Sequence, residues 1–169
     1  MPAAKPQDLP EIFVPEDARW ASRAAARGEI RRLARGLYST NLDESVEQLV
    51  RRRWADVAAL YFPGAVVVDR SAVLASPTPD GLLFLDSGPA PARPRPVDLP
   101  GLRLRPRSGP GPIDGDMPFM ELWMSSPARA LLDNMRPSRA RSGTPRTLRR
   151  AGTEERVDQI ASVRGEPAL

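Results

Sequence analysis

The sequence contains neither cysteine nor histidine, and each absence excludes a class of chemistry. Without cysteine there is no disulfide, no thiol nucleophile and no thiolate ligand for a metal. Without histidine there is no imidazole to act as a general base or to bind zinc. We therefore expect no catalytic residue, no metal site and no cofactor, and we predict a non-enzymatic binding protein.

Long hydrophobic runs are also missing. No apolar run approaches the roughly 20 residues that span a bilayer, and the N-terminus lacks the charged-then-apolar pattern of a signal peptide. We expect no membrane partner and a cytoplasmic location. Prolines and glycines number 20 and 12, yet periodic apolar segments remain between them, which favours a folded chain over a disordered one.

Lysine is nearly absent too, so the net charge of +4 is carried by arginine, and the arginines form two clusters. The first comprises Arg19, Arg23, Arg27, Arg31, Arg32 and Arg35, with Glu29 as the only acid between residues 19 and 35. The second comprises Arg129, Arg136, Arg139, Arg141, Arg146, Arg149 and Arg150, with Asp133 as its only acid. Basic clusters of this kind suit contact with phosphates or with an acidic protein. A general use of arginine as the surface cation would produce the same pattern.

The residues around the first cluster predict a helix and a hairpin. Pro15-Glu16-Asp17 suits a first helical turn, and the helix is expected over Ala18–Arg27 with Gly28 just past its end. Ile30–Leu33 and Leu37–Ser39 then predict a tight hairpin. A helix stopped by glycine and followed by a basic hairpin is typical of the recognition helix and wing of a winged-helix DNA-binding protein.

The rest of the chain predicts a long helix, a small sheet and C-terminal helices. The long helix is expected over 44–61, capped by Asn41 or Asp43, with apolar residues at three- and four-residue spacing. About four short strands are expected to follow, with 119–124 forming one of them. Ser126-Pro127 predicts the start of a helix, and a further helix is expected within 146–162. The apolar stripe expected on the first of these helices comprises Ala128, Leu131, Leu132 and Met135.

The predicted fold class is thus α+β: a short, truncated winged-helix module followed by a small mixed sheet flanked by helices. We divide the chain into an arm (1–14), the winged-helix module (15–42), an α+β domain (43–135) and a basic C-terminal helix and tail (136–169). The module is expected to be truncated because only about 14 residues precede Pro15, too few for the two helices that support a recognition helix.

Three segments together resemble the AbiEi-type family of antitoxins and transcriptional regulators. The segment 27–38 is similar to the wing of that family, and Asp69-Arg70-Ser71-Ala72 stands where the family has a Ser-Ala dipeptide that opens a helix. Ser125-Ser126-Pro127-Ala128-Arg129-Ala130-Leu131-Leu132-Asp133 resembles the family's Thr-Ser-Pro-Ala-Arg-Thr-Leu-Leu-Asp segment. The order and spacing match across about residues 12–135.

This resemblance implies a winged helix that binds DNA, often at its own promoter, joined to a domain that counters a toxin of the nucleotidyltransferase type. By position, Arg19, Arg23 and Arg27 would face the major groove or its phosphates. Arg31, Arg32 and Arg35 would contact the backbone or the minor groove from the wing, where the guanidinium fork suits phosphate and guanine edges. For the protein partner we expect contacts from Arg136, Arg139, Arg141, Arg149 and Arg150.

The same layout resembles the segment in front of the catalytic domain of some Fic-type, AMP-transferring proteins. Residues 132–141 are closest to that version, whereas the Fic signature itself requires a histidine that this chain lacks. The alternative function is therefore an N-terminal regulatory and protein-interaction module of such a protein, without DNA binding.

Five aspartates raise the question of a metal-dependent nuclease: Asp69, Asp80, Asp86, Asp114 and Asp116. The lysine that such a site needs after its second acid is missing, so we expect Asp80-Gly81 to be a turn and Asp86 to end a strand. Asp114-Gly115-Asp116 is expected to be a solvated turn. Ser71 and Ser126 lack a histidine partner, and Ser126 is expected to cap a helix.

Overall fold

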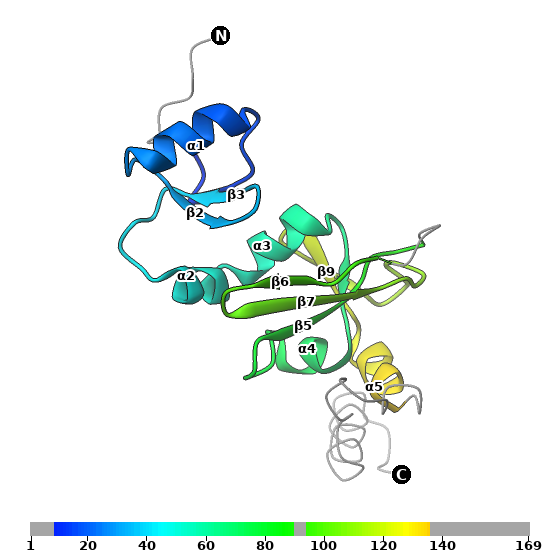
Figure 1. Cartoon of the computed structure of the whole chain (residues 1–169). Helices are drawn as coiled ribbons and strands as arrows, with labels where there is room; N and C mark the ends of the chain where they lie inside the picture. Colours follow the sequence, from blue (N-terminus) through cyan, green and yellow to red (C-terminus); the bar gives the residue numbers. More distant parts are fainter. Residues whose placement is uncertain (1–8, 90–93, 136–169) are drawn as a thin grey trace.

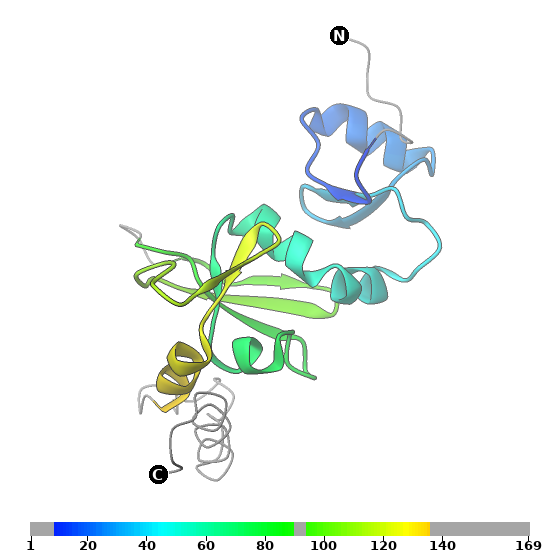
Figure 2. The same cartoon turned by 180° about the vertical axis from the view of Figure 1, so that it is seen from behind.

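The computed structural model describes residues 9–89 and 94–135, and shows a mixed α+β chain arranged in successive layers (Figures 1 and 2). Helix α1 (Ala18–Ala26) lies at one end, against a three-stranded sheet. Helices α2 (Val46–Arg52) and α3 (Trp54–Tyr61) separate this sheet from a six-stranded one. Helices α4 (Asp69–Leu74) and α5 (Pro127–Met135) lie at the opposite end. Among the described residues, no helix combines the length and the apolar character required to cross a membrane.

The predicted helix and hairpin of the N-terminal module are confirmed. The first turn expected at Pro15-Glu16-Asp17 is wrong, because the helix begins at Ala18 and Asp17 is its N-cap, accepting hydrogen bonds from the backbone N–H groups of Arg19 and Trp20. Gly28 follows the helix with φ of 73°, as expected. The hairpin consists of β2 (Arg31–Ala34) and β3 (Leu37–Ser39), and β1 (Ile12–Phe13) pairs antiparallel with β3. The expected arm therefore ends in a strand that completes the sheet order β1-β3-β2.

Each face of this small sheet belongs to a different hydrophobic core. Phe13 and Tyr38 pack with the buried side of α1, together with Ala21, Ala24 and Ile30. Ile12, Leu33 and Leu37 lie on the other face and join the main core beneath α2 and α3. Because successive side chains of a strand point to opposite faces, two adjacent residues such as Ile12 and Phe13 contribute to two cores.

The prediction of one long helix over 44–61 is wrong in two respects. It is broken at Arg53 into α2 and α3, which run in different directions in Figure 1 although no proline or glycine stands there. The cap is Ser45, whose hydroxyl accepts from Gln48 N in a capping box. Asn41 instead uses its side-chain oxygen for the backbone N–H groups of Asp43 and Glu44 in the preceding turn. The predicted apolar face is confirmed, since the side chains of four of its residues are fully buried: Leu49, Val50, Val57 and Ala58.

The larger sheet has six strands rather than about four, in the order β6-β7-β5-β4-β9-β8. Its strands are β4 (Val66–Val67), β5 (Leu82–Asp86), β6 (Val97–Leu99), β7 (Leu102–Arg107), β8 (Met117–Phe119) and β9 (Leu122–Met124). β4 runs parallel to β9 and β5 runs parallel to β7, while the other neighbours are antiparallel. Leu83, Leu85, Leu102 and Leu104 face α2 and α3 and form the centre of the main core.

The segment 119–124 is a hairpin and not the single strand that we expected. The chain reverses at Met120, whose φ of 54° is unusual for a residue with a side chain. No glycine or proline stands at the turn, so the sequence carries no signal for it. At α4, Val68 is the N-cap residue, and Asp69 is the first helical residue with φ of 55°.

Candidate nucleic-acid interface

Four arginines of the N-terminal module are exposed and have no carboxylate within ion-pairing distance among the described residues. Arg19 and Arg23 lie on α1, on the side opposite its buried Ala21 and Ala24. Arg32 lies on β2, and Arg35 lies in the turn of the hairpin. Four exposed guanidinium groups on a helix and an adjacent hairpin give this module a local excess of positive charge.

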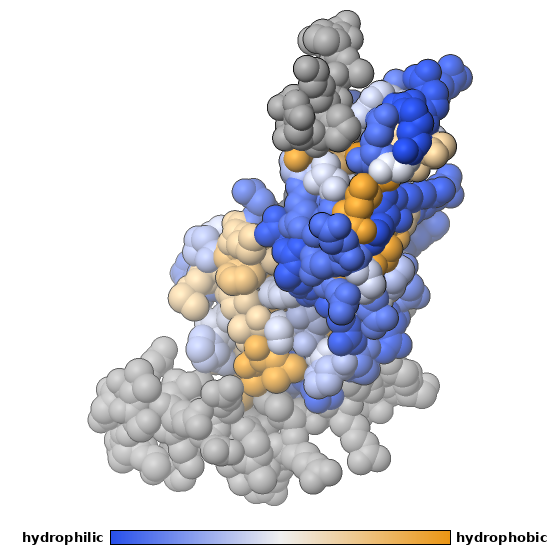
Figure 3. All heavy atoms as spheres, turned by 90° about the vertical axis from the view of Figure 1, so that its left-hand side faces the viewer, coloured by the Kyte–Doolittle hydropathy of each residue, from blue (hydrophilic) through white to orange (hydrophobic). Residues whose placement is uncertain are grey.

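The other two arginines of the first cluster are engaged within the protein. Arg27 forms a bidentate pair with Glu29, with Nε–Oε1 and Nη2–Oε2 distances of 2.6 and 2.9 Å. Arg31 donates to the backbone carbonyls of Leu42 and Glu44, and so ties the hairpin to the segment before α2. Residues of this segment and of α2 lie on the side shown in Figure 3, whose surface is mainly hydrophilic with small apolar patches.

Arginines of the larger sheet contrast with those of the module, because aspartates neutralise them. Arg103, Arg105 and Arg107 alternate along β7 and therefore share one face of the strand. Each forms an ion pair, with Asp80 (3.3 Å), Asp98 (2.7 Å) and Asp133 (2.5 Å) respectively. This face therefore offers no comparable surplus of positive charge.

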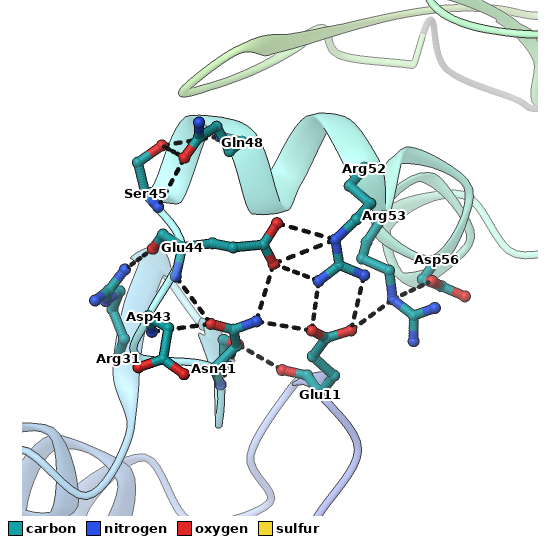
Figure 4. Close-up of polar contacts among 11 residues, drawn as sticks. Glu11, Arg31, Asn41, Asp43, Glu44, Ser45, Gln48, Arg52, Arg53 and Asp56 are labelled. Atoms are coloured by element: carbon teal, nitrogen blue, oxygen red, sulfur yellow. Dashed lines mark hydrogen bonds and ion pairs between the residues drawn. The ribbon is translucent and has the colours of Figure 1, made fainter.

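A polar network fixes the N-terminal module to the α2–α3 junction (Figure 4). The carboxylate of Glu11, next to β1, accepts hydrogen bonds from Arg52 (2.6 Å) and Asn41 (3.0 Å) and lies 2.9 Å from Arg53 Nε. Glu44 accepts from Arg52 and Asn41 as well. Sequence analysis missed this network because its members are separated by up to 41 residues and no periodic pattern joins them.

The charges in this network stabilise one another. Hydrogen bonds from Arg52 and then from Asn41 hold the pKa of Glu11 below its usual value. The pKa of Glu44 is lowered chiefly by its hydrogen bond from Arg52, and the two carboxylates raise the pKa of Arg52 in return. Glu11 directly precedes Ile12, which belongs to the main core, so the polar network and this apolar contact both link the module to the main domain.

A second, buried network surrounds Arg129, at the first turn of α5. Its guanidinium pairs with Asp86 at the end of β5 (2.6 Å) and with Asp116, and it donates to the carbonyl of Gly111 (2.9 Å). The side chain of Arg129 is 8% exposed and those of both aspartates are 0% exposed. The turn 114–116 is therefore not simply solvated as we expected, because Asp116 is buried against Arg129.

This network also corrects the apolar stripe expected on α5. Ala128 and Leu132 are exposed, and the buried side of the helix carries Arg129, Ala130, Leu131, Asp133 and Asn134. Of the residues expected in the stripe, only Leu131 is buried, while the side chain of Met135 lies outside the described residues. The prediction of an apolar stripe is wrong because two charged residues can be buried on this side of the helix. Ion pairs with Asp86 and Asp116 compensate the burial of Arg129, and the ion pair with Arg107 compensates the burial of Asp133.

The remaining candidate groups have structural roles. Ser126 caps α5 by accepting from Arg129 N, as expected, and Asp80-Gly81 lies in a turn with Thr78. Ser71 accepts from Phe84 N and so joins α4 to β5. In the described ranges, no three acidic side chains come together in a way that could hold a metal ion. The second arginine cluster beyond Arg129, with the expected partner contacts Arg136, Arg139, Arg141, Arg149 and Arg150, lies outside the described residues.

In comparisons with known proteins, no family model, no curated protein and no solved structure matches this chain.

Proposed function

We propose that this chain is a non-enzymatic DNA-binding regulator of the antitoxin type, acting through a shortened winged helix formed by β1, α1 and the β2–β3 hairpin. The observation that carries the proposal is the set of exposed, unpaired arginines on α1 and the hairpin. A winged helix presents these two elements side by side to a duplex. The sequence resemblance to AbiEi-type regulators over residues 12–135 supports the same function.

The way the module is held also supports DNA binding. β1 pairs with β3, and Phe13 and Tyr38 pack beneath α1. The sheet therefore provides part of the support that two preceding helices give in a complete winged helix. The Glu11–Arg52 pair and Arg31 fix the hairpin on the main domain. A module held in this way loses little conformational entropy on binding.

Fluorescence anisotropy with labelled duplex DNA from the region upstream of the coding sequence tests the proposal. We expect affinity to fall steeply with salt, with a slope of about −0.9 per phosphate contacted. Arg19→Ala, Arg23→Ala and Arg35→Ala combined should remove most of this dependence. A matched variant, Arg95→Ala, Arg103→Ala and Arg105→Ala, lowers the net charge by the same amount and should bind as the wild type does. An equal loss of DNA affinity in both triple variants would contradict the assignment of the DNA-binding surface to the N-terminal module.

A second candidate function, binding a partner enzyme without contacting DNA, is favoured by the β8–β9 hairpin. Met117 and Met120 on this hairpin are 57% and 61% exposed, and methionine is common at protein-binding surfaces. The partner would be a nucleotidyltransferase-type toxin or a Fic-type domain. Co-expression with such an enzyme should give co-purification that Met117→Ser with Met120→Ser abolishes, while the triple arginine variant retains it.

A further inference from the structure

We infer that the β8–β9 hairpin is the docking surface for a basic amphipathic helix of a partner protein. The apolar side chains of that helix would lie on the methionines of the hairpin, and its lysines or arginines would pair with two acidic residues. This inference rests on the second candidate function and deepens it by stating the chemistry of the partner. The surface, called here the hairpin surface, comprises Ile113, Asp114, Met117, Met120 and Glu121.

The apolar part of the hairpin surface continues a sheet face that α3 covers only in part. Met117 and Phe119 alternate along β8 and therefore lie on the same face of the strand. Phe119 stacks on Trp54 of α3, with ring centroids 5.7 Å apart, whereas Met117 is 57% exposed. Met117 lies opposite the half-buried Met124 of β9. Cover by α3 thus ends between Phe119 and Met117, which leaves apolar side chains at the surface.

Methionine is concentrated in this hairpin. Three of the five methionines in the sequence, Met117, Met120 and Met124, fall within β8, β9 and the turn between them. Met120 is exposed in the turn, and Ile113 is exposed in the segment that leads into β8. Flexible, polarizable methionine side chains adapt to apolar groups of different shapes, and such surfaces are common where a protein binds helices of its partners.

Acidic residues stand at both ends of the hairpin surface. Asp114 lies in a turn at the base of the hairpin, which the 2.9 Å hydrogen bond from Ser126 N to Asp116 joins to the start of α5, and Glu121 lies in the turn at the tip. Both are exposed, and neither side chain has a hydrogen bond or an ion pair with any described residue. The Debye length is about 8 Å at physiological ionic strength, so these carboxylates set the local charge although the chain carries +4 overall.

The free edge of β8 favours a helix over an added strand. β8 is the last strand of the six-stranded sheet, and Pro118 stands at its centre. Proline lacks the N–H group that an added strand would need at such an edge. The hairpin is also held in place, because the carbonyl of Glu121 accepts from Gly64 N (3.1 Å) and Phe119 stacks on α3. A surface held in this way loses little conformational entropy on binding.

Methionine-methyl NMR of the full chain, titrated with three synthetic peptides of equal length, tests the inference. The first peptide is an amphipathic helix with leucine on one face and lysine on the other. The second has glutamate in place of lysine, and the third has serine in place of leucine. We expect the leucine–lysine peptide to shift the methyl signals of Met117, Met120 and Met124. The leucine–glutamate peptide should bind the hairpin roughly tenfold more weakly, and the serine–lysine peptide should leave the three signals unchanged.

Substitution of the two acids separates the effect of charge from that of apolar contact. Asp114→Asn combined with Glu121→Gln should bind the leucine–lysine peptide about fivefold more weakly than the wild type does. Glu16→Gln combined with Asp43→Asn is the matched control, because it removes two exposed carboxylates that form no ion pair with a described residue elsewhere in the chain. This control should bind the peptide as the wild type does, and thermal unfolding checks that both double variants are folded.

Equal binding of the two leucine peptides by the wild type would overturn the inference and leave an apolar protein-binding hairpin, as the second candidate function requires. Hairpin signals that stay unchanged with the leucine–lysine peptide would also overturn it. Co-purification with a partner enzyme that survives Met117→Ser with Met120→Ser would overturn the second candidate function and this inference together. DNA binding by the arginines of the N-terminal module is independent of each of these results.

Discussion

The guanidinium of Arg129 lies 2.6 Å from the carboxylate of Asp86, although the two residues are 43 positions apart in the chain and both side chains are almost fully buried. This pair links the first turn of α5 to the end of β5. The same guanidinium holds Asp116, so one side chain connects a helix, a strand and the loop between β7 and β8. Arg129 thus has a structural role.

Removing this guanidinium should therefore destabilise the protein strongly. Arg129→Met fills a similar volume but leaves Asp86 and Asp116 buried without a counter-charge, and we expect a loss of about 3–5 kcal/mol in the free energy of unfolding. Asp98→Asn is the comparison, because its pair with Arg105 is exposed and should contribute less than about 1 kcal/mol. Urea denaturation measures both. A loss in Arg129→Met no larger than in Asp98→Asn would contradict the importance of the buried network.

Gly109 should be intolerant of any side chain. A Cβ at this position would lie 2.5 Å from Cγ of Asp86, and the carboxylate cannot move without losing Arg129. We expect Gly109→Ala to cost about 1–3 kcal/mol through overpacking. Gly64→Ala meets no atom within 4 Å and should cost about 1–2 kcal/mol through its positive φ of 69° alone. Denaturant titration of double variants that combine either glycine change with Asp98→Asn provides the measurement. The loss in free energy of unfolding should equal the sum of the two single losses, because neither glycine change acts through that exposed aspartate.

Arg31 and Arg35 should behave differently although both belong to the expected DNA-binding set. Arg31 donates to two backbone carbonyls, and Arg31→Ala should lower the free energy of unfolding by about 1.5–3 kcal/mol. The Arg35 side chain has no hydrogen bond or ion pair with a described residue, and Arg35→Ala should change the free energy of unfolding by less than about 0.5 kcal/mol. Thermal unfolding of the two variants without DNA distinguishes these roles. Equal stabilities would show that Arg31 is not a structural residue.

Capping of α2 provides a smaller effect with a matched control. Ser45→Ala removes the acceptor for Gln48 N and should cost about 0.5–2 kcal/mol. Asp43→Ala removes only an exposed carboxylate and should be close to neutral. If Asp43→Ala were the more destabilising of the two in urea titrations, the cap would lie where the sequence had suggested.

Acid should weaken the attachment of the N-terminal module. The pKa of Glu11 is lowered from its ordinary value of 4.5, mainly by Arg52. Its carboxylate therefore contributes stability that is fully present above that value and is lost as the pH falls through the lowered pKa. The free energy of unfolding of Glu11→Gln should consequently fall less than that of the wild type between about pH 6 and about pH 3. Glu47→Gln removes a carboxylate from an exposed pair and controls for the loss of one charge.

The parts of the fold that sequence analysis predicted correctly are those marked by local signals. Gly28 marks the end of α1, and the hairpin follows from the apolar residues around Arg35-Gly36. The break at Arg53 and the reversal at Met120 carry no such local signal, since no proline or glycine stands at either position. The ion pairs of Arg129 were missed because a periodic pattern assigns a charged residue to the surface.

For the candidate site the sequence named six arginines of the N-terminal module but could not show which of them are engaged within the protein. Arg19, Arg23, Arg32 and Arg35 are exposed as expected. Their neighbours Arg27 and Arg31 have the same residue type and similar spacing, yet one pairs with Glu29 and the other holds backbone carbonyls 11 and 13 residues away. Availability for binding is decided by those contacts, which only a three-dimensional structure supplies.

One face of the small sheet packs under α1 and the other lies in the main core, so the sheet joins the N-terminal module to the larger domain. Ile12, Leu33 and Leu37 cannot leave the main core without exposing apolar surface of that core, so the module and the larger domain should open together. A ligand that binds α1 and the hairpin then stabilises every part of this cooperative unit by the same free energy, and slow hydrogen exchange would extend from the central strands to the module.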